Sequence, residues 1–370
     1  MFERSIRDCN VAVVGGCGFL GSHLVNHLID DRKCNVVVID NLVVGRKEFL
    51  HPKASFCHAD ITHSEEYLYG IFQQTRTQYV FNYAAYPYIP DSFERPLHVF
   101  TVNANGALNV INAAQRAHVS GILQVSSAEI YGNWTLNGQQ DGRNMIQEDD
   151  EVHPHSSYGA SKAAVDFMVQ ARWREDRTRC IALRQFNCIG ERETHPYVLP
   201  EIITQLYKQV DWLPPEGPAE IVSQLLDRIA DWTPIPEEGR SPGKTGERHG
   251  VVHLGNNSSR DFMYAGDAVA MAVQLLEDGK FGEVYNLGSE ESIKVYDLAK
   301  AVARILGFTM LDIRQSLHKI RPWEIWHLQS NNSKINEVVT HRPTVTLDQA
   351  IVRTLQHYIE NKGIWAWEKR

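Results

Sequence analysis

The 370-residue sequence has no run rich in lysine or arginine, no long apolar segment and no internal repeat. Its formal net charge is −8, so neither a nucleic acid nor an anionic membrane is expected as a partner. The first eight residues lack the apolar stretch of a signal peptide, and no later segment approaches a membrane span. From these absences we expect a cytoplasmic protein.

Cysteine is present, but without the spacing of a structural site. None of the six cysteines forms a Cys-x-x-Cys pair, so the pattern indicates neither a disulfide framework nor a zinc site. We therefore expect reduced thiols and no bound metal. The six are Cys9, Cys17, Cys34, Cys57, Cys180 and Cys188.

Short apolar strands alternate with helical patterns through the first half of the chain. This alternation predicts an α/β fold of the Rossmann type, with a doubly wound parallel sheet and right-handed crossovers. Ligands bind such sheets at the carboxyl ends of the strands. The expected strands lie near 10–14, 35–39, 54–58, 79–82, 121–125 and 179–183.

The pattern loosens after about residue 190, where we expect a smaller C-terminal α/β lobe for the substrate. Two polar or Pro/Gly-rich stretches, 133–157 and 211–249, are interpreted as insertions, either surface decoration or a lid or subunit contact. The predicted division is 1–190 for the nucleotide-binding domain with a return segment near 260–290, and 191–259 with 291–370 for the lobe.

A glycine-rich turn follows the first expected strand. The run GGCGFLG occupies 15–21 and leads into an amphipathic stretch at 22–29. Strand, glycine turn and helix in this order predict a dinucleotide site, because glycines let the backbone approach a pyrophosphate at a helix N-terminus. Asp40 ends the second strand and favours NAD over NADP, although Arg46 close behind it can soften that preference.

Tyr158 and Lys162 are four residues apart in a helical pattern, so their side chains share one face. A nearby ammonium group favours a phenolate, so we expect Lys162 to lower the pKa of Tyr158 and make it a general base. Ser127, at the end of a strand, can hydrogen-bond the same substrate oxygen. This combination predicts oxidation of an alcohol by a bound nicotinamide.

These motifs resemble the extended short-chain dehydrogenase/reductase family, of the nucleotide-sugar epimerase/dehydratase type. Asp60-Ile61, Ala84-Ala85, the NANG run at 103–106, the RQFN run at 184–187 and the RDF run at 260–262 follow in the family's order. The runs at 88–93 and 199–205 are similar to those of UDP-N-acetylglucosamine 4,6-dehydratases.

The resemblance implies a set of binding residues. For NAD it implies Gly15, Gly18, Phe19, Leu20, Gly21, Asp40, Asn41, Asp60, Ile61, Ala84, Ala85, Asn103, Tyr158 and Lys162. For a nucleotide-diphosphate sugar it implies Tyr86, Ser127, Asn187, Arg260 and Arg321, with the arginines on the diphosphate. Family members often form homodimers through helices that include 98–118 and 157–176, and we expect the same here.

The reaction depends on Glu129. In 4,6-dehydratases of this family a glutamate at this position removes the C5 proton after C4 has been oxidised, so a 4,6-dehydratase is the leading hypothesis. The implied catalytic residues are Ser127, Glu129, Tyr158 and Lys162. Ala128 replaces the aspartate of the two-carboxylate members. A 4-epimerase, a C5-epimerase and a decarboxylase therefore stay open, as does a non-catalytic NAD-binding sensor.

Overall fold

The computed structural model describes residues 5–133, 144–193, 196–210 and 248–361. The chain forms two compact units. The first comprises the described parts of Met1–Cys188, Arg260–Ser292 and Ile325–Thr344, and the second comprises the remainder. Ile325–Thr344, which the sequence analysis assigned to the substrate lobe, packs in the first unit because its residues contact the return segment. The expected insertion at 211–249 falls almost wholly outside the described residues, as does 134–143 of the other one.

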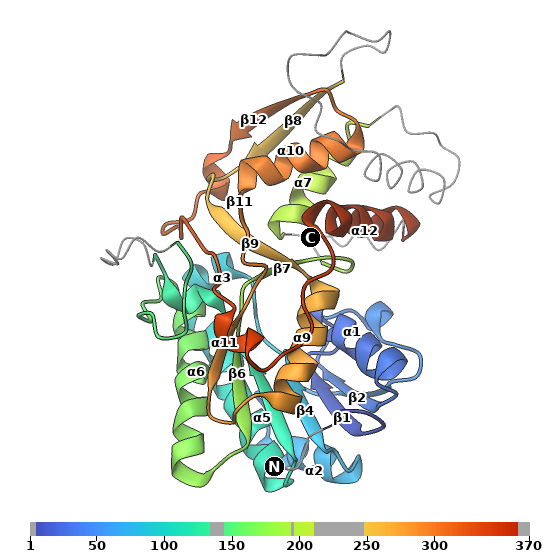
Figure 1. Cartoon of the computed structure of the whole chain (residues 1–370), viewed down its shortest axis with the longest axis vertical. Helices are drawn as coiled ribbons and strands as arrows, with labels where there is room; N and C mark the ends of the chain where they lie inside the picture. Colours follow the sequence, from blue (N-terminus) through green and yellow to red (C-terminus); the bar gives the residue numbers. More distant parts are fainter. Residues whose placement is uncertain (1–4, 134–143, 194–195, 211–247, 362–370) are drawn as a thin grey trace. The chain divides into compact units, whose positions relative to one another are not determined.

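A seven-stranded parallel sheet forms the centre of the first unit (Figure 1). Its order, β10-β6-β5-β4-β1-β2-β3, confirms the doubly wound sheet, and β10 is the predicted return strand. The bounds are β1 Asn10–Val14, β2 Asn35–Asp40, β3 Ser55–His58, β4 Tyr79–Asn82, β5 Gly121–Val125, β6 Cys180–Gln185 and β10 Val284–Leu287.

Helices cover both faces of this sheet, which explains why β4 and β5 at its centre are buried along their whole length (Figure 1). Along β1, Val11 and Val13 pack in one core with α1 and α9, while Ala12 and Val14 pack in the other with α2 and α5. The helices are α1 Phe19–Asn26, α2 Glu65–Gln74, α3 Ile89–Glu94, α4 Pro96–Phe100, α5 Ala107–Arg116, α6 Ser157–Asp176, α9 Ala265–Asp278 and α11 Ser333–Asn336. π-helical turns η1 (His27–Asp31) and η3 (Thr101–Gly106) follow α1 and precede α5.

The helices expected to carry a dimer contact are α4 to α5 and α6. On α6, Val169 is buried in the same core as Ala12 and Val14 of β1, whereas Phe167 is 53% exposed. Val169 therefore serves this chain's own core, and the homodimer stays a prediction.

The second unit contains a parallel pair of strands, β8 (His249–Leu254) and β12 (Met310–Gln315). Its helices are α7 Val198–Tyr207, α10 Val295–Leu306 and α12 Leu347–Glu360, and α10 packs against both α7 and α12. Three of the passages of the chain between the units fall within short strands, β7 (Asn187–Ile189), β9 (Ser259–Tyr264) and β11 (Ser292–Lys294), which form a sheet in the order β11-β9-β7. The other two follow Glu324 and Thr344.

Candidate active site

The glycine turn at 15–21 is built by close backbone packing. Gly15 has a φ of +78°, and a Cβ there would lie 2.6 Å from the Ala84 nitrogen. A Cβ on Gly21 would lie 2.1 Å from the Gly15 oxygen. Gly18 precedes α1 without a side-chain cap, so the first backbone N–H groups of this helix have no side-chain acceptor from that residue. This arrangement suits a pyrophosphate at the helix N-terminus.

Asp40 links the end of β2 to that turn. Its carboxylate accepts the backbone N–H groups of Cys17 at 3.0 Å and Leu42 at 2.8 Å. Burial raises the pKa of Asp40, and the two backbone hydrogen bonds oppose the rise. Since each carboxylate oxygen has two lone pairs, Asp40 can hold the turn and still accept ribose hydroxyls. These features of the glycine turn and β2 fit a dinucleotide cofactor.

Asn41 and Asp60 are joined at the neighbouring strand ends, where the Asn41 amide donates to Asp60 at 2.8 Å. Burial would raise the pKa of Asp60, but hydrogen bonds from Thr62 and Asn41 outweigh it and the pKa is lowered. The carboxylate therefore stays charged beside β2.

Asn103, in η3, ties the loop after β4 to α6. Its oxygen accepts the backbone N–H of Tyr86 at 2.6 Å, and its nitrogen donates to the Ser161 hydroxyl at 3.1 Å. Ser161 donates in turn to the carbonyl of Tyr158 at 2.7 Å. Ser161 therefore links Asn103, a predicted cofactor residue, to Tyr158, the predicted base, through two hydrogen bonds.

Tyr158 is buried at the start of α6 and hydrogen-bonded to Ser127. Burial raises the pKa of Tyr158 to about 12; the Ser127 hydrogen bond lowers it and the charge of Glu129 raises it. Burial lowers the pKa of Lys162 to about 8. The structure brings Ser127 and Tyr158 together, and their roles on a substrate oxygen stay predictions.

The prediction that Lys162 lowers the pKa of Tyr158 is wrong for this structure. The Lys162 ammonium donates to the Val125 carbonyl at 3.0 Å. It therefore acts on the end of β5, and the pKa of Tyr158 rises instead of falling because burial dominates.

Glu129 lies in a single 3₁₀ turn, η4 (Ala128–Tyr131), which begins directly after Ser126 and Ser127, the two residues that follow β5. Ser127 caps this turn by accepting the Glu129 backbone N–H at 3.2 Å. Glu129 is half-buried, and its charge acts on Tyr158. Ala128 is 2% exposed and packs in an apolar cluster with Ile130 and Phe186.

The predicted substrate residues Arg260, Asn187 and Arg321 differ in burial and in the unit to which they belong. Arg260 is 6% exposed and donates to the Ile325 carbonyl at 2.6 Å, whereas Asn187 is half-buried in β7. Arg321 belongs to the second unit, with its guanidinium 4.0 Å from Glu324. The roles of these residues on a diphosphate stay predictions.

Tyr86 belongs to a polar group that sequence reasoning missed. Its hydroxyl donates to Asp91 at 2.8 Å and accepts from Arg95 at 2.7 Å, and Arg95 also pairs with Asp91. The i,i+4 spacing of Asp91 and Arg95 is the signal that would have found the pair. Arg184 and Asp166, which form a second such group, lie too far apart in the sequence for any local signal.

Within the described ranges, no group of three histidine, cysteine or acidic side chains can hold a metal ion. No described helix is both long and apolar enough to cross a membrane. All six cysteines are free, and burial raises the pKa of Cys17, in the glycine turn, to about 12. Cys17 therefore carries no reactive thiolate.

The fold and this site together define a dinucleotide-binding protein with a serine–tyrosine–lysine set. A sequence model of the NAD dependent epimerase/dehydratase family matches residues 11–288, and the chain belongs to that family. NAD is accordingly its cofactor, and it is an enzyme of the nucleotide-sugar dehydratase and epimerase type. The hypothesis of a non-catalytic sensor is not supported.

Relatives of both reaction types are similar to this chain. Human dTDP-D-glucose 4,6-dehydratase is 25% identical over 366 residues, covering 96% of this chain and 91% of that protein. A putative UDP-glucose 4-epimerase of Methanocaldococcus jannaschii is also 25% identical, over 346 residues, covering 93% and 97%. The dTDP-glucose 4,6-dehydratase of Streptomyces venezuelae, solved with NAD bound, has the same fold, with a TM-score of 0.73, 21% identity and coverage of 96% and 98%.

Proposed function

We propose that this enzyme is an NAD-dependent nucleotide-sugar 4,6-dehydratase. The observation that carries the proposal is the position of Glu129: half-buried, two residues after Ser127, with its charge acting on Tyr158. A carboxylate at such a place can remove a proton from a substrate carbon next to the one that Tyr158 and Ser127 address.

Tyr158 and Ser127 would carry out the first proton transfer. The glycine turn and Asp40 would hold NAD, which would supply a hydride acceptor for C4 of the sugar and a hydride donor for C6. Tyr158 takes the proton of the C4 hydroxyl at its phenolic oxygen, and Ser127 hydrogen-bonds the same substrate oxygen. Burial raises the pKa of Tyr158 to about 12, so the phenolate would depend on the positive charge of the bound cofactor.

Glu129 would act after C4 has become a ketone. The ketone acidifies the C5 proton, and Glu129 takes that proton at its carboxylate. With Ala128 beside it, Glu129 also gives a proton to the departing C6 hydroxyl, which leaves as water. C5 regains a proton as C6 receives the hydride, and this balances the proton that Tyr158 took from the C4 hydroxyl. The net change is loss of one water and formation of a 4-keto-6-deoxy sugar.

The substrate would be a sugar linked to a nucleoside diphosphate. Arg260 and Arg321 supply guanidinium groups, and Asn187 an amide, for the diphosphate oxygens. Arg260 is already fixed by its bond to the Ile325 carbonyl. That bond supports a preformed orientation of the remaining guanidinium donors.

A 4-epimerase is the second candidate, and Ala128 is the observation that favours it. The buried methyl group provides no acid for the leaving hydroxyl. Tyr158, Ser127 and Lys162 alone suffice to oxidise C4 and reduce it from the opposite face. This reaction changes no mass.

The deciding experiment incubates the protein in heavy water with a panel of UDP-, GDP-, CDP- and dTDP-sugars, followed by mass spectrometry. Loss of water supports the dehydratase, and an isomer of unchanged mass supports the epimerase. Glu129→Gln is expected to abolish water loss while the absorbance of the reduced nicotinamide still rises. Glu151→Gln, which changes an exposed carboxylate between η4 and α6, serves as the matched control. Full dehydration by Glu129→Gln would contradict the proposal.

A further inference from the structure

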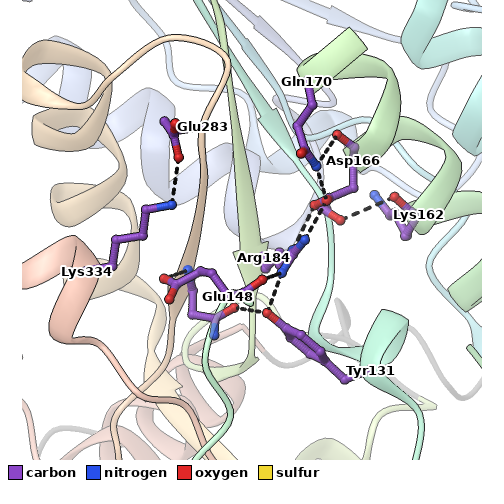
Figure 2. A network of polar contacts seen from close by, with 10 residues as sticks. Tyr131, Glu148, Lys162, Asp166, Gln170, Arg184, Glu283 and Lys334 are labelled. Atoms are coloured by element: carbon purple, nitrogen blue, oxygen red, sulfur yellow. Dashed lines mark hydrogen bonds and ion pairs between the residues drawn. The ribbon is translucent and has the colours of Figure 1, made fainter. Parts of the chain in front are cut away.

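Arg184, in β6, lies at the centre of a buried polar network (Figure 2). Its Nε and Nη2 donate to the two carboxylate oxygens of Asp166, at 3.1 and 2.8 Å. Its Nη1 donates both to the Tyr131 hydroxyl and to the Glu148 carbonyl, each at 2.7 Å. The guanidinium is thus held in one plane by three different segments.

Two of these segments carry the proposed catalytic groups. Asp166 is on α6, four residues after Lys162 and eight after Tyr158, so the three share a face of the helix. Tyr131 ends η4, two residues after Glu129. One guanidinium therefore connects the helix of the base with the turn of the second carboxylate.

We propose that Arg184 is a positioning residue that sets where Glu129 lies relative to Tyr158. The inference rests on the proposed function, because it assigns separate steps to these two groups. Arg184 does not act on the substrate itself; it acts through Asp166 on one side and Tyr131 on the other.

The chemistry of the network supports a single arrangement. Burial alone would lower the pKa of Arg184, but Asp166 and Tyr131 raise it, so the guanidinium stays charged. A lysine has no planar fork and would not reproduce the paired bonds to Asp166. The Tyr131 hydroxyl accepts from Arg184 and donates to the Asn286 side chain at 2.7 Å. Both roles of that hydroxyl are used, and its rotation is fixed.

The Tyr131 side of the network can be removed alone. Tyr131→Phe deletes the hydroxyl, keeps the ring in its apolar cluster, and leaves Arg184 bonded to Asp166 and the Glu148 carbonyl. Tyr285→Phe is the matched control, because it deletes another buried hydroxyl, which accepts from the Lys280 backbone at 3.1 Å, outside the bonds that Arg184 makes.

The experiment measures two rates for each variant with NAD and the processed nucleotide sugar. One is the appearance of the reduced nicotinamide, which depends on Tyr158; the other is deuterium uptake at C5 with loss of water, which depends on Glu129. Tyr131→Phe is expected to slow the second rate by about 10-fold to 100-fold, because small misplacements of a reacting group have effects of this size. The first rate should change by less than about 2-fold. Tyr285→Phe should leave the ratio of the two rates unchanged.

Amide hydrogen exchange provides a readout that needs no substrate. Tyr131→Phe should speed exchange at Ile130 and Gly132, whose N–H groups bond within η4, while Tyr285→Phe should not. An unchanged rate ratio together with unchanged exchange in Tyr131→Phe would overturn the positioning role. If wild-type protein neither exchanges the C5 proton nor loses water, the proposed function fails, and the exchange data alone then decide whether the network orders η4.

Discussion

The glycine turn and η4 are both short turns after parallel strands, yet they are held in different ways. The glycine turn is shaped by the missing Cβ atoms of Gly15 and Gly21 and by the backbone bonds of Asp40. The η4 turn is shaped by side chains from distant segments, above all Arg184. Cofactor binding and chemistry should therefore be separable by mutation, and the predictions below test that separation.

The largest effect is expected for Tyr158→Phe. Removing the phenolic oxygen removes the general base, so turnover should fall by about 10²-fold to 10⁴-fold. NAD affinity, measured by isothermal titration calorimetry, should stay within a few-fold of wild type, since the glycine turn is untouched. Comparable losses of affinity and turnover would argue against separate cofactor and catalytic regions.

Asp166→Asn should destabilise the protein strongly, because Arg184 is left buried and charged without its counter-ion. The free energy of unfolding should drop by about 3–5 kcal/mol, the usual cost of breaking a buried pair. Glu283→Gln is the control, since its pair with Lys334 is 48% exposed on the Glu283 side and should contribute less than about 1 kcal/mol (Figure 2). Denaturant titration checks both values, and equal losses in the two variants would contradict the expectation.

Gly21→Ala should weaken NAD binding by about 100-fold, because the new methyl group has to displace the Gly15 carbonyl. Gly70→Ala provides the matched control: nothing lies within 4 Å of its Cβ position in α2, and alanine is the better helix former. Calorimetric titration with NAD compares the two variants. Undiminished affinity in Gly21→Ala would show that the turn does not hold the cofactor.

The smallest expected effect is the contribution of Lys162 to the pH dependence of the free energy of unfolding. Burial lowers its pKa from 10.5 to about 8, so between these values the unfolded chain binds the proton that the folded protein has lost. Stability supplied by this group therefore rises with pH from about 8 to 10.5. Above pH 10 the raised pKa of Tyr158 acts in the opposite sense. The wild type should gain on the order of 1 kcal/mol relative to Lys162→Met between pH 8 and pH 10, in urea titrations of the ligand-free protein.

The sheet was predictable because most of its strands are short, largely apolar runs next to a recognisable turn or helix. The strand at 121–125 was placed at its exact bounds, Gly121–Val125, and the return strand fell within the predicted segment. The glycine turn was also predictable, because its sequence motif lies within the seven neighbouring residues 15–21.

The rest depends on contacts between residues that are distant in the sequence. The bond of Lys162 to the Val125 carbonyl spans 37 positions, and the bond of Arg184 to Tyr131 spans 53. No helical or strand periodicity encodes such a pairing. For the same reason the sequence did not reveal that Ile325–Thr344 packs in the first unit.

The packing around Ala128 limits how this site can change. An aspartate there would put a carboxylate among Ile130, Phe186 and Leu328. The polar atom that this cluster does contain, the Tyr131 hydroxyl, is already bonded to Arg184 and Asn286. The apolar packing around Ala128 therefore opposes a second acidic residue at this position, even if that residue would help catalysis. Redesign of the chemistry would have to start with the apolar neighbours of Ala128 and only then turn to the acid itself.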